Sequence, residues 1–383
     1  MADSSPITLP EVNVAVLANA RSSNIGNGAL LEGTLRVLRE DFPSKIFSRV
    51  LPWDEYSFQR KDFDEDFIAD INEKSDLLLV IGAVTFNGRP YYTRGGMRFD
   101  LDPEQMAGIK KPVVFYGLSY RFWGGTEYGH LDKLKAAIDY IDGREDFLLA
   151  LRDDGSMEWL TKMVGFPLTS AVTIPDPAMF VPHGSEHAAK SDQKQVFISL
   201  NNEDAATRFR EPDSLALLLD AIASAITHVV EKWNAQVTIV NHYFDDLELV
   251  NPLLNRLAPW IAHMHVESVG PAHIRDTEGF YSHYERADVV ISMRVHSMTP
   301  AVGMGIPCII LESQDRISSF SKKLGLQDMT IGIYDQELPS KLLTLLDNTL
   351  TNQDEIPNKT KVEVARRRQV LRDFNVKVAG LLR

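Results

Sequence analysis

The sequence predicts an α/β protein with two Rossmann-like domains, each built on a mostly parallel sheet. Short apolar runs recur along the chain with helical stretches between them, and strands that alternate with helices form right-handed βαβ units. The pattern appears twice, on either side of a polar segment at residues 175–195. We therefore expect two domains, residues 1–180 and 181–383, whose sheets face a shared cleft.

Most of the expected strands are apolar on both faces, which is typical of strands buried in a parallel sheet. The runs in the first half are Val12–Ala18, Leu77–Ile81, Val113–Tyr116, Phe147–Leu151 and Ala171–Ile174. The runs in the second half are Val196–Leu200, Val237–Val240, His263–Val269, Val289–Ser292 and Cys308–Leu311. Amphipathic helices are expected at residues 28–40 and 213–233, and a long basic helix at 359–383 that packs back on the first domain.

The composition is that of an ordinary globular protein, with 383 residues, 44% of them hydrophobic and 24% charged. A net charge of -13 disfavours nucleic acid and anionic membranes as partners, because both repel an acidic chain. The single cysteine, Cys308, cannot form an intrachain disulfide. Without an apolar run of 18 residues we expect no transmembrane segment, and we expect a cytoplasmic protein. The oligomeric state stays open.

The strongest candidate site is the stretch "SMRVHSMTPAVGMGIP", which follows the run Val289–Ser292. Open α/β sheets bind ligands at the carboxyl ends of their strands, where Ser292, Arg294 and His296 are expected to lie. Ser297 or Thr299 is expected to cap the next helix, with Pro300 in its first turn. A guanidinium, an imidazole and a helix N-terminus together suit a phosphate or carboxylate.

The alternative for this stretch is purely structural. Arg294 would then pair with a local acid such as Asp288, and His296 would only fill space.

Weaker candidates follow other expected strands. The segment "NARSSNIGNGALLEG" follows the first strand, and its glycines permit close backbone approach. Polar side chains also follow the run Leu77–Ile81, and Arg208 follows the first strand of the second half. The residues concerned are Asn24, Gly26, Asn27 and Gly28, then Thr85, Asn87 and Arg89. No set of histidines has a full ligand set, so no metal site is expected.

Taken in order along the chain, several motifs resemble those of the polysaccharide pyruvyl transferase family. Each is weak alone, but they occur in the family's order from about residue 19 to residue 326. The motifs are "NIGN", "SDLLLVIGA", "KPVVFYGLSY", "LRDDGSMEWLTKMVG", "IPDPAMF", "SMRVHSMTPAVGMGIP" and the basic Arg316 before "SSFSKKLGL".

The resemblance implies a two-domain, GT-B-like protein that moves pyruvate from phosphoenolpyruvate onto sugar hydroxyls as a ketal. It implies no cofactor beyond this donor substrate, and a saccharide or glycolipid as acceptor. Arg294 and His296 would bind or act on phosphoenolpyruvate, with His296 as acid or base because imidazole titrates near neutral pH. Ser292, Ser297, Arg316 and Arg208 would complete the donor site. The turn at residues 24–28 and the loop at residues 85–89 would face the acceptor.

The chain also departs from the family pattern. Asn27 replaces an aspartate, Ala83 replaces a glycine, and the family's arginine is absent from "SLNN" unless Arg208 or Arg210 substitutes for it. Two alternatives therefore stay open. One is a GT-B-type glycosyltransferase that uses a nucleotide sugar, with Glu312 on a ribose. The other is a sugar-binding member of the family without catalytic activity.

Overall fold

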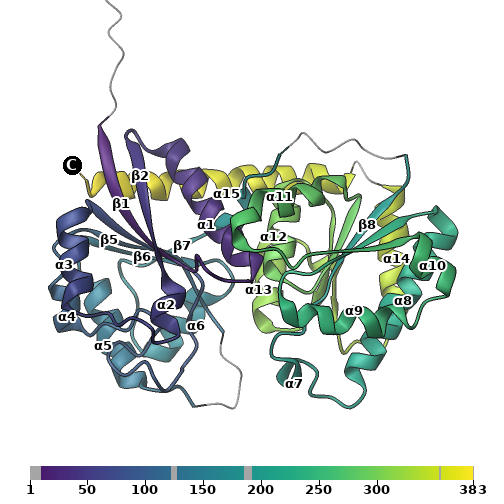
Figure 1. The fold of residues 1–383 in the computed structure, drawn as a ribbon, viewed down its shortest axis with the longest axis horizontal. Helices are drawn as coiled ribbons and strands as arrows, with labels where there is room; N and C mark the ends of the chain where they lie inside the picture. The colour runs from purple at the N-terminus through teal and green to yellow at the C-terminus, as the bar shows by residue number, and fades with distance from the viewer. Residues whose placement is uncertain (1–9, 122–126, 185–191, 353–354, 383) are drawn as a thin grey trace, which may run out of the picture. The chain divides into compact units, whose positions relative to one another are not determined.

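The computed structural model describes residues 10–121, 127–184, 192–352 and 355–382. The chain forms two compact units, each with its own parallel sheet (Figure 1), so the predicted fold class of two Rossmann-like α/β domains is confirmed. Both units are discontinuous in sequence. Unit 1 comprises Met1–Ala20, Thr34–Pro175 and Arg368–Arg383, and unit 2 comprises Arg21–Gly33 and Asp176–Arg367.

Unit 1 contains a parallel sheet in the order β2-β1-β3-β5-β6-β7, with β4 paired to β5. The strands are β1 (Glu11–Ala18), β2 (Lys45–Pro52), β3 (Leu77–Ile81), β4 (Val84–Phe86), β5 (Val113–Tyr120), β6 (Phe147–Arg152) and β7 (Val172–Ile174). The helices are α2 (Trp53–Ser57), α3 (Glu65–Lys74), α4 (Pro103–Ala107), α5 (Leu131–Asp142) and α6 (Ser156–Val164). Helix α1 (Ile25–Asp41) begins in unit 2 and ends in unit 1.

Unit 2 contains a parallel sheet in the order β10-β9-β8-β11-β12-β13. The strands are β8 (Gln195–Ser199), β9 (Gln236–Val240), β10 (Val266–Val269), β11 (Val289–Ser292), β12 (Cys308–Glu312) and β13 (Thr330–Gly332). The α-helices are α7 (Ala205–Arg208), α8 (Ser214–Trp233), α9 (Leu247–Leu254), α10 (Pro259–Met264), α11 (Thr277–Ser282), α12 (Val295–Gly303), α13 (Asp315–Leu324) and α14 (Leu338–Thr351). Helix α15 (Glu355–Gly380) begins in unit 2 and ends in unit 1. Short 3-10 turns are η1 (Pro177–Phe180), η3 (Phe244–Asp246), η4 (Ile274–Asp276), η5 (His283–Arg286) and η6 (Gln327–Met329).

Helix α8 is the core helix of unit 2. It is long and apolar enough to cross a membrane by length and composition alone, which is weak evidence. Its apolar side chains, among them Leu218, Ile222 and Ile226, are buried in the same cluster as strands β8, β9 and β11. This packing accounts for its apolar composition.

The run His263–Val269 was expected to form one strand, and only its second part does so. The first two of these residues lie in helix α10, and the strand starts only at Val266. Pro259 is the first residue of α10, a position where its fixed φ favours a helix. The strands β2, β4 and β13 were not predicted. β2 is an edge strand of mixed exposure, so its sequence lacks a continuous apolar run.

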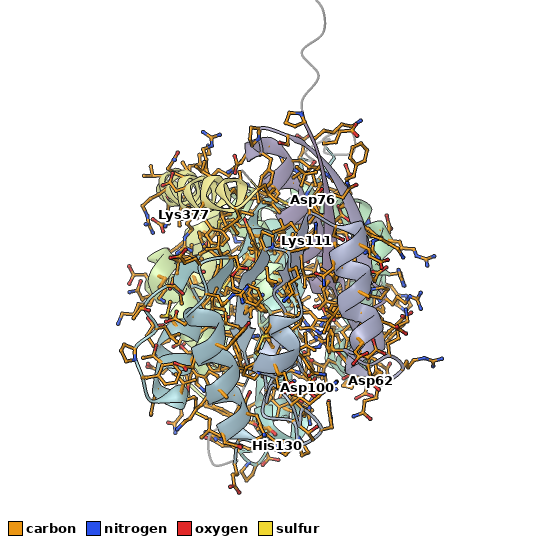
Figure 2. All side chains as sticks on the ribbon, turned by 90° about the vertical axis from the view of Figure 1, so that its left-hand side faces the viewer. Asp62, Asp76, Asp100, Lys111, His130 and Lys377 are labelled. Atoms are coloured by element: carbon orange, nitrogen blue, oxygen red, sulfur yellow. The ribbon has the colours of Figure 1, made fainter. Side chains whose placement is uncertain are left out.

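Helix α15 covers one end of unit 1 with its last residues. Asn375 is buried and accepts a hydrogen bond from Tyr116 Oη at 2.9 Å, while Arg368 pairs with Asp41 at 2.7 Å. Figure 2 shows Lys377 of α15 at the same end as Asp76 and Lys111, which precede β3 and β5. The other end of this unit, where the strands finish, remains uncovered by α15.

Candidate functional site

The stretch from β11 to α12 places Arg294 and His296 at the carboxyl end of the unit 2 sheet. β11 lies between β8 and β12, next to the point where the strand order reverses, which is where such sheets bind ligands. Ser292 Oγ accepts from the backbone N–H of Arg294 at 3.1 Å and donates to its carbonyl at 2.9 Å. This tight turn ends the strand, so Ser292 shapes the backbone of the site.

We expected Ser297 or Thr299 to cap helix α12, but the helix begins three to five residues earlier than either cap would allow. Its N-cap is Arg294, and Pro300 lies inside the helix. Because proline has no N–H, it cannot bond the carbonyl four residues before it, which belongs to His296. Tyr281 Oη donates to that carbonyl instead, at 2.7 Å. The backbone of His296 is thereby tied to helix α11.

Arg294 forms a buried ion pair with Asp246. Its Nη2 lies 2.5 Å from Asp246 Oδ1, its Nε donates to the Leu200 carbonyl at 3.3 Å, and its Nη1 lies 3.8 Å from Glu203. The acid that we considered as its structural partner, Asp288, instead accepts from the backbone N–H of Gln195. The guanidinium is therefore fixed in orientation, and much of its charge is balanced by Asp246.

His296 faces a buried carboxylate that the sequence reasoning did not single out. Its Nε2 lies 3.4 Å from Oδ2 of Asp176, which is fully buried at the start of η1. The other carboxylate oxygen of Asp176 accepts from the N–H of Ala178 at 2.9 Å, which fixes the group. A carboxylate beside an imidazole orients the ring and favours its protonated form. The signal in the sequence was the motif "IPDPAMF", whose aspartate we had not placed in the site.

The turn before helix α1 packs directly on His296. A Cβ built on Gly26 would lie 2.5 Å from Nδ1 of His296 and 2.8 Å from its Cβ. The first N–H groups of this helix are occupied, because Ile25 donates to the His242 carbonyl at 3.1 Å and Gly26 to Asn24 Oδ1 at 3.1 Å. The turn thus encloses the imidazole and belongs to unit 2, whereas we had expected it on the acceptor side.

Asn27 and Gly28 have structural contacts in this turn. Asn27 Nδ2 donates to Ser22 Oγ at 2.9 Å. A Cβ built on Gly28 would lie 2.1 Å from Thr277 Oγ1. The amide at residue 27 therefore holds the turn together, a role that does not need the family's aspartate.

Two further glycines bring Asp176 close to His296. A Cβ on Gly33 would lie 2.1 Å from the Pro177 carbonyl oxygen, and a Cβ on Gly303 would lie 1.9 Å from the Met179 carbonyl oxygen. The segment η1 is therefore packed against the backbones of α1 and α12. Only a residue without a side chain permits this approach.

A network of buried polar side chains lies next to His296 in unit 2. His242 Nε2 lies 2.6 Å from Tyr284 Oη, which donates to Ser297 Oγ at 2.9 Å. Burial lowers the pKa of His242 well below its usual range, and the nearby charges of Arg294 and His296 lower it further. His242 is therefore neutral. Ser297 is fully buried in this network, so its side chain supports α12.

A family model for polysaccharide pyruvyl transferase matches residues 24–315, most of the chain. The chain belongs to the polysaccharide pyruvyl transferase family. The matched range covers Asn24, Asp176, Arg294 and His296, and it ends one residue before Arg316. A search of curated proteins found no match.

Solved structures share the fold of this family member at low sequence identity. A putative UDP-N-acetylglucosamine 2-epimerase from Listeria monocytogenes is 12% identical, with a TM-score of 0.54 over 91% of this chain and 90% of its own. The N-terminal domain of trehalose-6-phosphate phosphatase from Candida albicans is 11% identical, with a TM-score of 0.51 over 99% of this chain and 98% of its own. These likenesses support the GT-B-like fold class. As a family member with this fold, the protein is a transferase that modifies saccharides.

The remaining predicted donor residues lie near the ends of β8 and β12. Arg208, on α7, is buried; its Nε donates to the Glu203 carbonyl at 3.1 Å and its Nη1 to Ser313 Oγ. Ser313 follows β12, and Arg316 lies in the first turn of α13. Arg208 and Arg316 therefore lie on two short helices of unit 2, α7 and α13, which the contact between Arg208 and Ser313 brings near each other.

The predicted acceptor loop at residues 85–89 belongs to unit 1, whereas the turn at residues 24–28 belongs to unit 2. Thr85 is fully buried, and its hydroxyl donates to the Ala83 carbonyl at 3.2 Å. Asn87 is partly buried and Arg89 is exposed. In this loop, Arg89 is therefore the side chain most open to a ligand.

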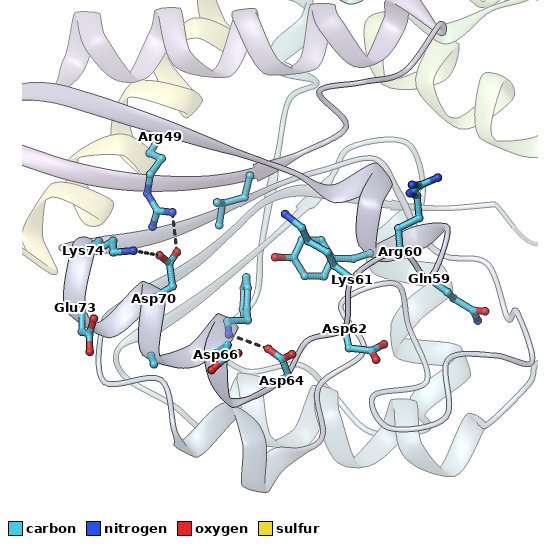
Figure 3. Close-up of a pocket in the computed structure, with 14 residues that line it drawn as sticks. Arg49, Gln59, Arg60, Lys61, Asp62, Asp64, Asp66, Asp70, Glu73 and Lys74 are labelled. Atoms are coloured by element: carbon cyan, nitrogen blue, oxygen red, sulfur yellow. Dashed lines mark hydrogen bonds and ion pairs between the residues drawn. The ribbon is translucent and has the colours of Figure 1, made fainter.

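Two cavities among the described residues have walls that do not favour an anionic donor. A cavity of about 910 Å³ in unit 1 (Figure 3) has more acidic than basic side chains, and its Arg49 and Lys74 both pair with Asp70, at 2.7 and 2.8 Å. Burial raises the pKa of Tyr56 in its wall to about 12, as do the neighbouring carboxylates. A cavity of about 430 Å³ between α8 and α14 has no lysine or arginine in its wall. In the described parts of the chain, no group of three histidine, cysteine or acidic side chains suits a metal ion.

Proposed function

We propose that the protein transfers pyruvate from phosphoenolpyruvate to hydroxyl groups of a saccharide, forms a ketal and releases phosphate. The observation that carries this proposal is the contact between His296 and the buried carboxylate of Asp176. Arg294, which Asp246 holds in place, lies two positions before His296 in the sequence. The chain belongs to the family in which this reaction is expected. The reaction needs a proton donor and positive charge at one place.

The proposed chemistry starts with protonation. Protonated His296 gives its proton to C3 of phosphoenolpyruvate, which leaves positive character on C2. An acceptor hydroxyl adds to C2 and gives its proton to the now neutral His296. The bond between C2 and the phosphate oxygen then breaks, phosphate leaves, and a neighbouring hydroxyl of the acceptor adds to C2 and releases its proton to solvent, which closes the ketal. The carboxylate of Asp176 favours the protonated imidazole that the first step needs.

The positive charge for the donor comes from arginines in this proposal. Arg294 offers a guanidinium whose orientation is fixed by Asp246 and Leu200, so little reorganisation is needed when an anion arrives. Because Asp246 balances part of that charge, we assign additional positive charge to Arg208 and Arg316. The buried, free Cys308 is compatible with the cytoplasmic location that we propose.

The deciding experiment is phosphate release from phosphoenolpyruvate by the purified protein with a panel of saccharide and glycolipid acceptors. We expect release by the unmodified protein, and a loss of at least about 100-fold in His296→Ala because an acid–base group is removed. His263→Ala, an exposed histidine on α10, is the matched control and is expected to keep full activity.

Binding measurements separate this function from its rivals. Calorimetry is expected to show binding of phosphoenolpyruvate and no binding of nucleotide sugars. Tight binding of a nucleotide sugar without binding of phosphoenolpyruvate would overturn the proposal in favour of a glycosyltransferase. Donor binding without turnover on every acceptor would indicate a sugar-binding protein.

A further inference from the structure

Arg98 of unit 1 holds a guanidinium at the carboxyl ends of strands β1 and β2. Its Nη2 donates at 2.6 Å to Oδ1 of Asn19, the residue after β1, and its Nε donates at 2.5 Å to Ser57 Oγ of α2. The guanidinium carbon lies 5.0 Å from the centre of the Trp53 ring, directly after β2. β1 has β2 on one side and β3 on the other, so Arg98 lies at the point where the strand order of this sheet reverses.

The hydrogen-bond partners of this guanidinium are neutral. Among the residues that the structure describes, no carboxylate forms an ion pair with Arg98, and Ser57 and Asn19 carry no charge. Burial lowers the pKa of Arg98, and the positive charge of Arg121 lowers it too, while Tyr92 and Asp54 act in the opposite direction. Asp54 therefore supplies part of the counter-charge without a direct ion pair, and a ligand anion bound to the guanidinium would offset more of the cost of burying this cation.

Hydrogen-bonding capacity remains on the same side chain. Nη1 of Arg98 donates to none of the described residues. Tyr92 and Tyr91 both raise the pKa of Arg98. Burial raises the pKa of Tyr92, so its phenol stays protonated at physiological pH. Tyr91 is 43% exposed, and its ring centre lies 4.7 Å from that of Tyr92. An exposed aromatic face beside a cation suits a sugar ring that carries an anion.

We propose that Arg98 anchors an anion-binding subsite in unit 1, which takes a carboxylate or phosphate carried on a saccharide, with Tyr91 against the sugar ring. The guanidinium donates through Nη1 to the anion, and Asn19 and Ser57 hold it in place. This inference deepens the proposed function: if the protein is a pyruvyltransferase, its acceptor is an acidic or phosphorylated saccharide. The binding itself does not depend on that reaction.

The test is calorimetry with three probes that share a glucose ring: glucuronate, glucose 6-phosphate and methyl glucoside. We expect at least one anionic sugar to bind about 10-fold more tightly than methyl glucoside, since charge-assisted hydrogen bonds add to sugar contacts. A preference for glucuronate indicates an acidic sugar, and a preference for glucose 6-phosphate indicates a phosphorylated one. Arg98→Gln is expected to lose about 10-fold or more of this affinity.

The matched control is Arg144→Gln, which removes the same charge from unit 1. Arg144 pairs with Asp146 before β6, among the amino-terminal ends of the strands, and its loss is expected to leave sugar binding unchanged. If Arg98→Gln does not fold, as judged by circular dichroism, Arg98→Lys and Tyr91→Ala replace it. Arg98→Lys is expected to keep part of the preference for anionic sugars, and Tyr91→Ala to weaken binding of all three probes.

Several outcomes overturn the subsite. The subsite is excluded if anionic sugars do not bind the unmodified protein. It is also excluded if they bind Arg98→Gln, or the variants that replace it, as tightly as they bind the unmodified protein. Binding that disappears in His296→Ala but persists in Arg98→Gln places the anion in unit 2 and also excludes it. The proposed function is tested separately by binding of phosphoenolpyruvate, which is expected to be equal in the unmodified protein and Arg98→Gln. Failure of phosphoenolpyruvate to bind either protein contradicts the function and leaves the subsite standing.

Discussion

Tyr281 donates a hydrogen bond to the backbone carbonyl of His296 across 2.7 Å, in the place that a helical N–H would normally take. The helix lacks that N–H because residue 300 is proline. Burial raises the pKa of Tyr281 well above its usual range, so its hydroxyl stays protonated and remains a donor. The position of the proposed catalytic histidine therefore depends on a side chain from another helix.

Tyr281→Phe is expected to lower the free energy of unfolding by about 1–3 kcal/mol, because the carbonyl of His296 loses its donor. Urea denaturation measures this change. Equal stability of Tyr281→Phe and the unmodified protein would contradict the role given to this hydrogen bond.

Gly26→Ala is expected to reduce turnover about 100-fold and to lower the free energy of unfolding by about 1–3 kcal/mol, because the extra methyl group overpacks the site. The added methyl group would overlap the Cβ and ring of His296, atoms too close to the backbone to swing away, and a shift of about 1 Å in a catalytic group has an effect of this size. Steady-state kinetics and a thermal melt measure the two quantities. Gly332→Ala, where a Cβ has open space around it, is the control in the same unit. Full activity in Gly26→Ala would show that the contact is unimportant.

Asp176→Asn is expected to move the pH dependence of turnover to lower pH. The substitution removes the negative charge 3.4 Å from the imidazole, and protonated His296 then persists only in more acidic solution. Turnover against pH, together with calorimetry of phosphoenolpyruvate binding, tests this. Asp176→Glu is expected to restore part of the original profile. An unchanged profile in Asp176→Asn would remove Asp176 from the mechanism and leave it a structural residue.

The Asp347 carboxylate of α14 is expected to make unfolding depend on acid pH. Burial alone would raise its pKa, but hydrogen bonds from Lys232, His228 and Trp233 outweigh burial and lower the pKa to about 2 from 3.8. A lowered folded-state pKa contributes stability that is present above about pH 4 and is lost as the pH falls through about 2. We expect Asp347→Asn to be less stable by about 1–2 kcal/mol at pH 7, allowing for solvent screening. Denaturation at pH 7 and pH 2 measures this, and the difference is expected to be much smaller at pH 2 than at pH 7.

Local patterns in the sequence predicted the frame of the site. β11 matches the expected run Val289–Ser292, and the polar residues that follow it lie at the carboxyl end of the sheet as expected. Both signals are local, since a buried strand is a continuous apolar run and its end is marked by polar residues.

Contacts between distant residues could not be read in this way. Asp176 and His296 are 120 positions apart, and their approach depends on Gly33 and Gly303, each of which looks like any helical glycine in the sequence. Similarly, Asp246 lies in a short 3-10 turn with no motif to connect it to Arg294. Long-range packing also decides that residues 21–33 belong to unit 2.

The C-terminal part of helix α15 belongs to unit 1, and this affects when unit 1 can finish folding during synthesis. Its residues from Arg368 onward belong to unit 1, where Asn375 and Arg368 bind Tyr116 and Asp41. Synthesis runs from the N-terminus, so most of unit 1 leaves the ribosome long before this segment exists. A nascent chain that ends at residue 180 therefore carries Tyr116 and Asp41 without their partners. Unit 1 can complete its packing only after the segment from Arg368 onward has been synthesised.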